Sequence, residues 1–307
     1  MYKLLLVSLL FFCPKWIEGK NVLTLELYPS YQEESLDLTL QKSLSGSPLM
    51  YEEDYQNIRF FSTRLQIESI YRGIYSSLHA TLGFLGDGTL EQQYAPPRQS
   101  NLNAYLFRVG PSFFTETEVD FGFLAHLTPQ RRYQIMLGPY VGFLYFYETF
   151  TRKTALQMNE ETQSFLPSPF RLQRWGVLLG PALFFFPYPN LRIRARYGYG
   201  FLSQKQTLNA EFLLNQGAIS MQNRLRITLH GAHEHVGQLA ISGKVSKSVS
   251  LGISSHLGYF FTGSREGTRE LQEKELLTGV ETKTDEHVTY RMRQTSFSIG
   301  CTLGWCL

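Results

Sequence analysis

Two histidines with a glutamate between them could hold a metal ion or move a proton. In the segment "HGAHEHVG", residues 230–237, His233 and His235 flank Glu234. On a strand, alternate side chains point to opposite faces, so the imidazoles would share one face and the carboxylate would lie on the other. Metal sites of the helical kind need His at i and i+4 around a Glu. We therefore predict no metal site and no cofactor; only a site shared with another strand stays open.

A ladder of arginines is the second candidate. In "LRIRARYGYGF", residues 191–201, Arg192, Arg194 and Arg196 alternate with apolar residues. As a strand, this segment has one face of guanidinium groups and one of hydrocarbon and aromatic rings. What these groups do depends on what each face touches, and therefore on the elements that carry them.

The N-terminus is typical of an export signal. Lys3 precedes an apolar run of ten residues, Leu4 to Cys13, which is too short to span a bilayer as a helix. We predict a signal peptide over residues 1–19 and one domain over residues 20–307. The formal charge of the 307 residues is only +3, from 29 Lys and Arg against 26 Asp and Glu, and no nucleic-acid partner is expected.

Alternation with a period of two recurs along the whole chain. Tyr133 to Tyr147 is an unbroken 15-residue pattern, far longer than the usual strand of about 5 to 6 residues. A tilted strand crosses a bilayer with roughly 9 to 11 residues. Aromatic residues gather at both ends of the apolar faces, as in the girdles of an outer-membrane barrel. They are Tyr71, Tyr133, Phe185 and Trp305 at one end and Tyr145, Trp175, Tyr199 and Phe261 at the other.

Short and long connections alternate, which predicts an all-β, antiparallel, up-and-down barrel in the outer membrane of a bacterium. Short turns are predicted at 72–73, 128–131, 187–190 and 246–248, and long polar outer loops at 33–56, 87–102, 152–169, 211–218 and 265–285. The count is ten strands if 103–127 and 219–245 are single strands, and twelve if each hides a turn. Ten keeps the alternation strict and is the expected number.

The C-terminal strand resembles the assembly signal of bacterial outer-membrane barrels. Ser298, Gly300, Leu303 and Trp305 have its spacing of polar, glycine, hydrophobic and aromatic residues. The resemblance implies the barrel-assembly machinery as a partner, and outer-membrane lipid and lipopolysaccharide as surroundings.

The arginine ladder should face the barrel interior, because a guanidinium on the lipid face costs about 2 to 4 kcal/mol at the midplane. The predicted lumen-lining residues are Arg64, Glu68, Arg108, Asp120, Arg132, Arg174, Arg192, Arg194, Arg196, Arg224 and Arg226. Further inward residues are Glu26, Glu118 and Glu148, with His79, His126 and His256 as hydrogen-bonded core residues. Two interpretations follow. The charges pair as the core of a filled barrel, or they line a small pore that favours anions, since nine of these residues are cations and five are anions.

One segment resembles the omptins, ten-stranded outer-membrane proteases of about this length. "TDEHVTYR", residues 284–291, is similar to their Asp-x-His segment, which implies a general-base role for Asp285 and His287. In that family three strands follow this segment, and the second outer loop carries paired acids. Here one strand remains, and that loop offers only Asp87 and Glu91. Half of a catalytic constellation argues against proteolysis.

The sequence therefore favours a small porin-like channel or a filled structural barrel, and no enzyme is expected. The alternative is a surface adhesin or interaction protein that acts through its outer loops on an unknown ligand. An omptin-like protease is the third hypothesis, because one fold hosts many functions.

Overall fold

The computed structural model describes residues 22–44, 47–95, 103–128, 133–157, 164–166, 168–214, 219–275 and 278–306. The predicted signal peptide lies outside these ranges and stays a prediction. Among the described residues, no helix is long and apolar enough to cross a membrane.

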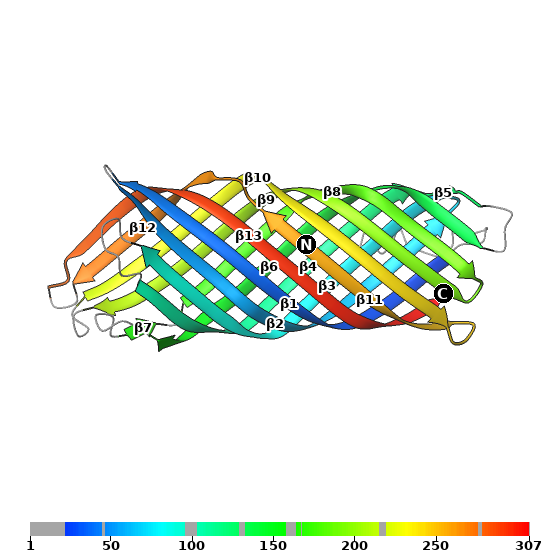
Figure 1. Ribbon diagram of the computed structural model, residues 1–307, viewed down its shortest axis with the longest axis horizontal. Coiled ribbons are helices and arrows are strands. Elements are labelled where there is room, and N and C mark those ends of the chain that lie inside the picture. Colours follow the sequence, from blue (N-terminus) through cyan, green and yellow to red (C-terminus); the bar gives the residue numbers. More distant parts are fainter. Residues whose placement is uncertain are drawn as a thin grey trace.

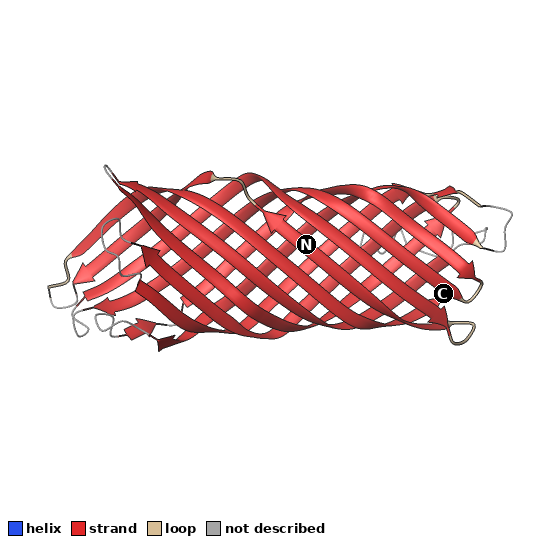
Figure 2. Cartoon of the chain, viewed as in Figure 1, coloured by secondary structure: helices blue, strands red, loops and turns tan. Residues whose placement is uncertain are grey.

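A single antiparallel sheet contains every described strand, and it closes on itself because β1 pairs with both β2 and β13 (Figure 1). The strands are β1 (Val22–Leu44), β2 (Ser47–Tyr71), β3 (Ile74–Ala95), β4 (Asn103–Phe123), β5 (Ala125–His126), β6 (Gln134–Gln157), β7 (Ser164–Leu166), β8 (Ser168–Tyr188), β9 (Leu191–Leu214), β10 (Ile219–Lys244), β11 (Val249–Phe261), β12 (Arg265–Glu275) and β13 (Glu281–Cys306). Figure 2 shows the result, a long barrel of tilted strands.

Ten of these form the wall when interrupted strands are counted together. β11 and β12 lie end to end, because both pair with β10 and with β13. β5 follows β4 after a break at Leu124 and pairs with β6, and the three-residue β7 pairs with β9. The predicted single strands over 103–127 and 219–245 correspond to β4 with β5 and to β10. The ten-strand prediction is confirmed.

The predicted long outer loops are largely wrong, because most of these residues are strand. In the stretch 33–56, β1 runs to Leu44 and β2 begins at Ser47, with these two residues paired. Polar side chains do not end a strand when both neighbouring strands continue and satisfy its backbone groups. β1, β4 and β10 have 23, 21 and 26 residues, about twice what a bilayer crossing needs.

An apolar band surrounds the end of the barrel that has the short turns. All eight aromatic residues of the predicted girdles are at least partly exposed, and Tyr133 contacts Phe185 edge-on with ring centroids 6.4 Å apart. Between the two girdles the outer face carries exposed residues such as Leu65, Phe143 and Leu179. An apolar band with aromatic edges is the surface of a barrel in a lipid bilayer. The remaining half of the wall stands beyond it.

We expect the protruding half to lie outside the cell. A peptide tag inserted after Gly279, which is exposed between β12 and β13, should bind antibody on intact cells. The same tag in the exposed turn 246–248 should bind antibody only after the outer membrane is permeabilised. Labelling in the opposite pattern would contradict this orientation.

Candidate functional site

Two arginines of the ladder pair with two glutamates inside the membrane band. Arg192 Nη2 lies 2.5 Å from Glu68 Oε1, and Arg194 Nη1 lies 2.9 Å from Glu68 Oε2 and 3.4 Å from Glu26 Oε2. Arg194 Nη2 also donates a hydrogen bond of 2.6 Å to the hydroxyl of Tyr28. These two arginines therefore link β9 across the interior to β1 and β2. Arg194 is almost fully buried.

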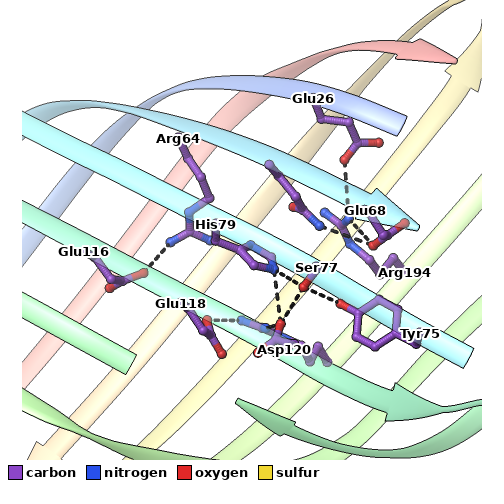
Figure 3. A network of polar contacts seen from close by, with 12 residues as sticks. Glu26, Arg64, Glu68, Tyr75, Ser77, His79, Glu116, Glu118, Asp120 and Arg194 are labelled. Atoms are coloured by element: carbon purple, nitrogen blue, oxygen red, sulfur yellow. Dashed lines mark hydrogen bonds and ion pairs between the residues drawn. The ribbon is translucent and has the colours of Figure 1, made fainter. Parts of the chain in front are cut away.

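The third arginine pairs with two carboxylates of β4. Arg196 Nη2 lies 2.6 Å from Glu118 Oε2, and its Nη1 contacts Asp120 Oδ2. Figure 3 shows Glu118 and Asp120 together with the Glu68 and Arg194 pair. Above it, Arg64 Nη2 lies 3.2 Å from Glu116 Oε1. Alternation on β4 aims Glu116, Glu118 and Asp120 at the interior.

Ser77, His79 and Asp120 have the residue types of a hydrolytic triad but lack its geometry. Ser77 Oγ donates to Asp120 Oδ2 at 2.6 Å, and His79 Nε2 lies 2.8 Å from Ser77 Oγ and 3.2 Å from the same Asp120 oxygen (Figure 3). In a triad the acid holds the other ring nitrogen. His79 Nδ1 has no hydrogen-bond partner among the described residues, and all three side chains are buried. The cluster is therefore part of the packed interior.

Arg174 marks the junction between this charged layer and an apolar layer above it. Its guanidinium lies 4.3 Å from the ring centroids of both Phe146 and Phe260, and its Nη1 lies 3.5 Å from Glu234 Oε1. Across the interior on β13, Gln294 Oε1 accepts a hydrogen bond from Arg174 Nη2, and Gln294 Nε2 donates to Glu34 Oε2 at 2.9 Å and to Glu148 Oε2 at 3.2 Å. The rings beside Arg174 and the amide of Gln294 therefore form the upper boundary of the charged layer.

In the protruding half the pattern of the faces is reversed. Its interior is an apolar cluster, in which Phe150 stacks on Phe170 with centroids 4.3 Å apart and Phe60 meets Phe114 at 5.0 Å. Its outer face carries exposed polar residues such as Asp37 and Arg291. Water outside the wall replaces lipid there, so the hydrophobic effect again drives apolar residues inward.

The described interior is filled. Every wall strand contributes inward side chains that are buried. In a water-filled channel, such side chains would be accessible to solvent. Gln66 and Glu148 in the charged layer and Phe170 in the apolar layer have 0% exposure. A cavity of about 110 Å³ at the short-turn end, lined by Glu26, Arg192 and other residues, lies below the buried Arg194.

The described interior does not have the expected excess of cations. The described interior has five arginines against eight carboxylic acids, which are Glu26, Glu34, Glu68, Glu116, Glu118, Asp120, Glu148 and Glu234. The expectation omitted Glu34, Glu116 and Glu234. Glu116 shares the alternation phase of Glu118, which was a signal available in the sequence.

The structure places Arg64, Glu68, Asp120, Arg174, Arg192, Arg194 and Arg196 inside the barrel, together with Glu26, Glu118, Glu148, His79 and His256. Arg132 and the side chains of Arg108 and Arg224 lie outside the described residues.

One predicted inward residue is on the outer face. Arg226 is exposed because the pairing of β9 and β10 shifts between His230 and Ala232, where Gly231 has a φ of 79°. The extra residue of such a bulge exchanges the two faces of the strand. His126 is also exposed, but it is paired in register with the buried Met136 and therefore shares its inner face; its exposure comes from its place on β5, at the end of the barrel.

The residues of the omptin resemblance do not assemble into a site within the described structure. His287 is exposed on β13, the last wall strand, where it is paired in register with Thr268. The side chains of Asp285, Asp87 and Glu91 lie outside the described residues. No group of three or more His, Cys, Asp or Glu that could hold a metal ion occurs in the described part of the chain.

The proposed assembly signal occupies both faces of β13. Ser298 is buried inside, whereas Leu303 and Trp305 are partly exposed on the other face beside the short-turn end. Its recognition by assembly machinery stays a prediction.

Comparison with known proteins identifies the fold. No protein-family model matches the sequence, and no curated protein matches it. The outer membrane protease OmpT from Escherichia coli superposes with a TM-score of 0.58 over 93% of this chain and 97% of its own, at 11% identity. The translocator domain of the autotransporter NalP from Neisseria meningitidis gives 0.33 over 100% and 96%, at 11% identity. The toluene transporter TodX from Pseudomonas putida gives 0.29 over 97% and 92%, at 9% identity. The chain has the fold of a bacterial outer-membrane β-barrel.

Proposed function

We propose that the protein is a non-conducting outer-membrane barrel, in which the ion network and the apolar cluster are a structural core. The observation that carries this proposal is the burial of inward side chains on every wall strand, through two successive layers. Solute passage would require separating the buried ion pairs of Arg194 and Arg196 and also the stacked rings of Phe150 and Phe170. Breaking one buried pair costs about 3 to 5 kcal/mol.

Such a barrel would act through its protruding half, which presents a surface for interaction with a ligand outside the membrane. About half of each long strand stands beyond the apolar band, and the core inside it keeps that half rigid. The outer ends of β12 and β13 are part of this surface. Cells that carry the full chain should adhere to a ligand-coated surface more strongly than cells that carry a variant whose strands are shortened to the apolar band.

We expect the purified, folded protein to produce no unitary currents in a planar bilayer. The physical reason is that both layers exclude a continuous file of water. The preparation is first shown to be folded by its faster migration on gels when unheated. Steady anion-selective or cation-selective openings from the folded material would overturn the proposal and favour a porin-like channel.

Proteolysis is the second candidate, because the barrel shares its fold with an outer membrane protease. Cleavage of a fluorogenic peptide library by the wild type, abolished by His287→Ala in a variant that still folds, would replace our proposal. We expect no cleavage above that of the empty membrane.

A further inference from the structure

The cavity of about 110 Å³ lies at the short-turn end of the barrel, the end that we expect to face the periplasm. Pro189, Asn190 and Lys244 form its mouth and are exposed, whereas Ser242 and Ser250 on its floor are buried. The backbone N–H of Lys244 donates a hydrogen bond of 2.7 Å to the carbonyl oxygen of Asn190, which holds the turn in place beside the mouth. The cavity is therefore open to the periplasm and closed by buried side chains below.

Small hydroxyl side chains line the floor of the cavity. Ser242 of β10 and Ser250 of β11 leave space that a larger inward side chain would fill. Within the described part of the chain, neither of these hydroxyls forms a hydrogen bond. A buried hydroxyl without a partner costs free energy unless water or a ligand bonds to it. The floor can therefore donate hydrogen bonds to a ligand.

Arg192 is held beside the floor with donors to spare. Its Nη2 donates to Glu68, its Nη1 lies 3.5 Å from the hydroxyl of Thr24, and its guanidinium lies 5.6 Å from the ring centroid of Phe184. A guanidinium has five N–H donors, so these contacts position the group without using all of them. Its side chain is 12% exposed, against 2% for that of Arg194. Arg192 is thus the residue of this pair that a ligand in the cavity can reach.

The charges around the cavity leave one positive charge in excess. The two arginines above it are balanced by the two glutamates with which they pair, Glu26 and Glu68. Lys244 at the mouth is exposed and, among the described residues, forms no ion pair. An ammonium group near a fixed guanidinium favours a ligand with one negative charge.

The remaining lining is apolar and sets the size of the ligand. Phe186, Pro189 and Leu191 border the cavity, and Phe186 packs against the apolar cluster that includes Phe184. At about 10 to 15 Å³ for each water, the cavity holds roughly seven to eleven waters, and therefore a ligand with about as many non-hydrogen atoms. An inorganic anion would leave these apolar surfaces uncovered.

We propose that this cavity binds a carboxylate that carries a small apolar group, such as an alanine with a free carboxyl end. The carboxylate accepts hydrogen bonds from Arg192, Lys244 and the hydroxyls of the floor, and the apolar group lies against Phe186 and Leu191. A free small acid and the C-terminus of a peptide share this chemistry, and the open mouth admits both. The site lies at the opposite end of the barrel from the protruding half and is independent of its role.

The test uses the full-length protein folded in detergent micelles and measures binding by isothermal titration calorimetry. N-acetylalanine should bind, whereas N-acetylalanine amide should bind at least tenfold more weakly, because a hydrogen bond to a charged group is worth about a factor of ten. Acetylated trialanine distinguishes the two sources: binding as tight as that of N-acetylalanine assigns the site to peptide ends, and weaker binding assigns it to free acids. No binding of N-acetylalanine, equal binding of its amide, or competition by inorganic phosphate would each overturn the proposal.

Two variants and a matched control locate the site. Lys244→Gln should weaken binding of N-acetylalanine about tenfold, and Ser242→Leu, which fills the floor, should abolish it. Lys247→Gln is the control, because Lys247 is exposed in the neighbouring turn and does not line the cavity, and it should change binding less than twofold. Migration of unheated samples on gels shows that each variant is folded, and Lys244→Gln decides alone if Ser242→Leu does not fold. Unchanged binding in Lys244→Gln, or equal losses in the two lysine variants, would show that the ligand binds elsewhere.

Discussion

Replacing Arg196 with methionine should lower the free energy of unfolding from lipid by about 3 to 5 kcal/mol. The change leaves Glu118 and Asp120 buried without the guanidinium that now contacts both. Few other donors are near them: Glu118 Oε1 and Asp120 Oδ1 have no hydrogen-bond partner among the described residues even with the arginine present. Urea titration of the barrel folded into lipid vesicles, followed by tryptophan fluorescence, measures the loss.

A compensated variant separates lost charge pairing from lost packing. Adding Glu118→Gln and Asp120→Asn to Arg196→Met removes the stranded charges, and most of the stability should return. Arg226→Met serves as the matched control, because that arginine is exposed and its change should alter stability by less than about 0.5 kcal/mol. A single Arg196→Met variant as stable as the wild type would show that the network is solvated and that the interior is open.

The barrel and its strand number follow from features that are local in the sequence. Alternation along Arg192, Ile193 and Arg194 fixes opposite faces because the period of a strand is two. Lipid then decides which face points outward, since hydrocarbon tolerates isoleucine and not guanidinium. The same logic placed Glu68, Asp120 and Arg174 inside, where the structure has them.

The height of the wall and its inverted upper half were harder to predict. A polar segment such as 33–56 resembles a loop when it is considered alone, but long-range pairing with β13 and within the β1 and β2 hairpin keeps it extended. The alternation of apolar and polar residues also does not reveal where a strand has a bulge. Ile227 and Leu229 keep the expected period, yet the shift at Gly231 turns them inward and Arg226 outward.

The charge balance of the interior also depends on that upper half. Glu34 and Glu234 belong to segments whose faces were assigned to loops or to a histidine motif, so neither was counted as inward. In the structure they meet Gln294 and Arg174 at the junction of the two layers. Among the described residues, the number of arginines therefore does not support an anion preference once both halves of the barrel are counted.

Leu179→Arg should weaken folding into lipid by about 2 to 4 kcal/mol, because Leu179 is exposed on β8 between the girdle residues Phe185 and Trp175. Ile193→Arg is the depth control. Ile193 is paired in register with Phe185, nearer the short-turn edge, where an arginine reaches the headgroups and costs about 0 to 1 kcal/mol. The measurement is the same urea titration in vesicles. Equal, small losses at both positions would mean that hydrocarbon does not surround β8 at Leu179, and the apolar band would then have to be a protein interface instead of a membrane surface.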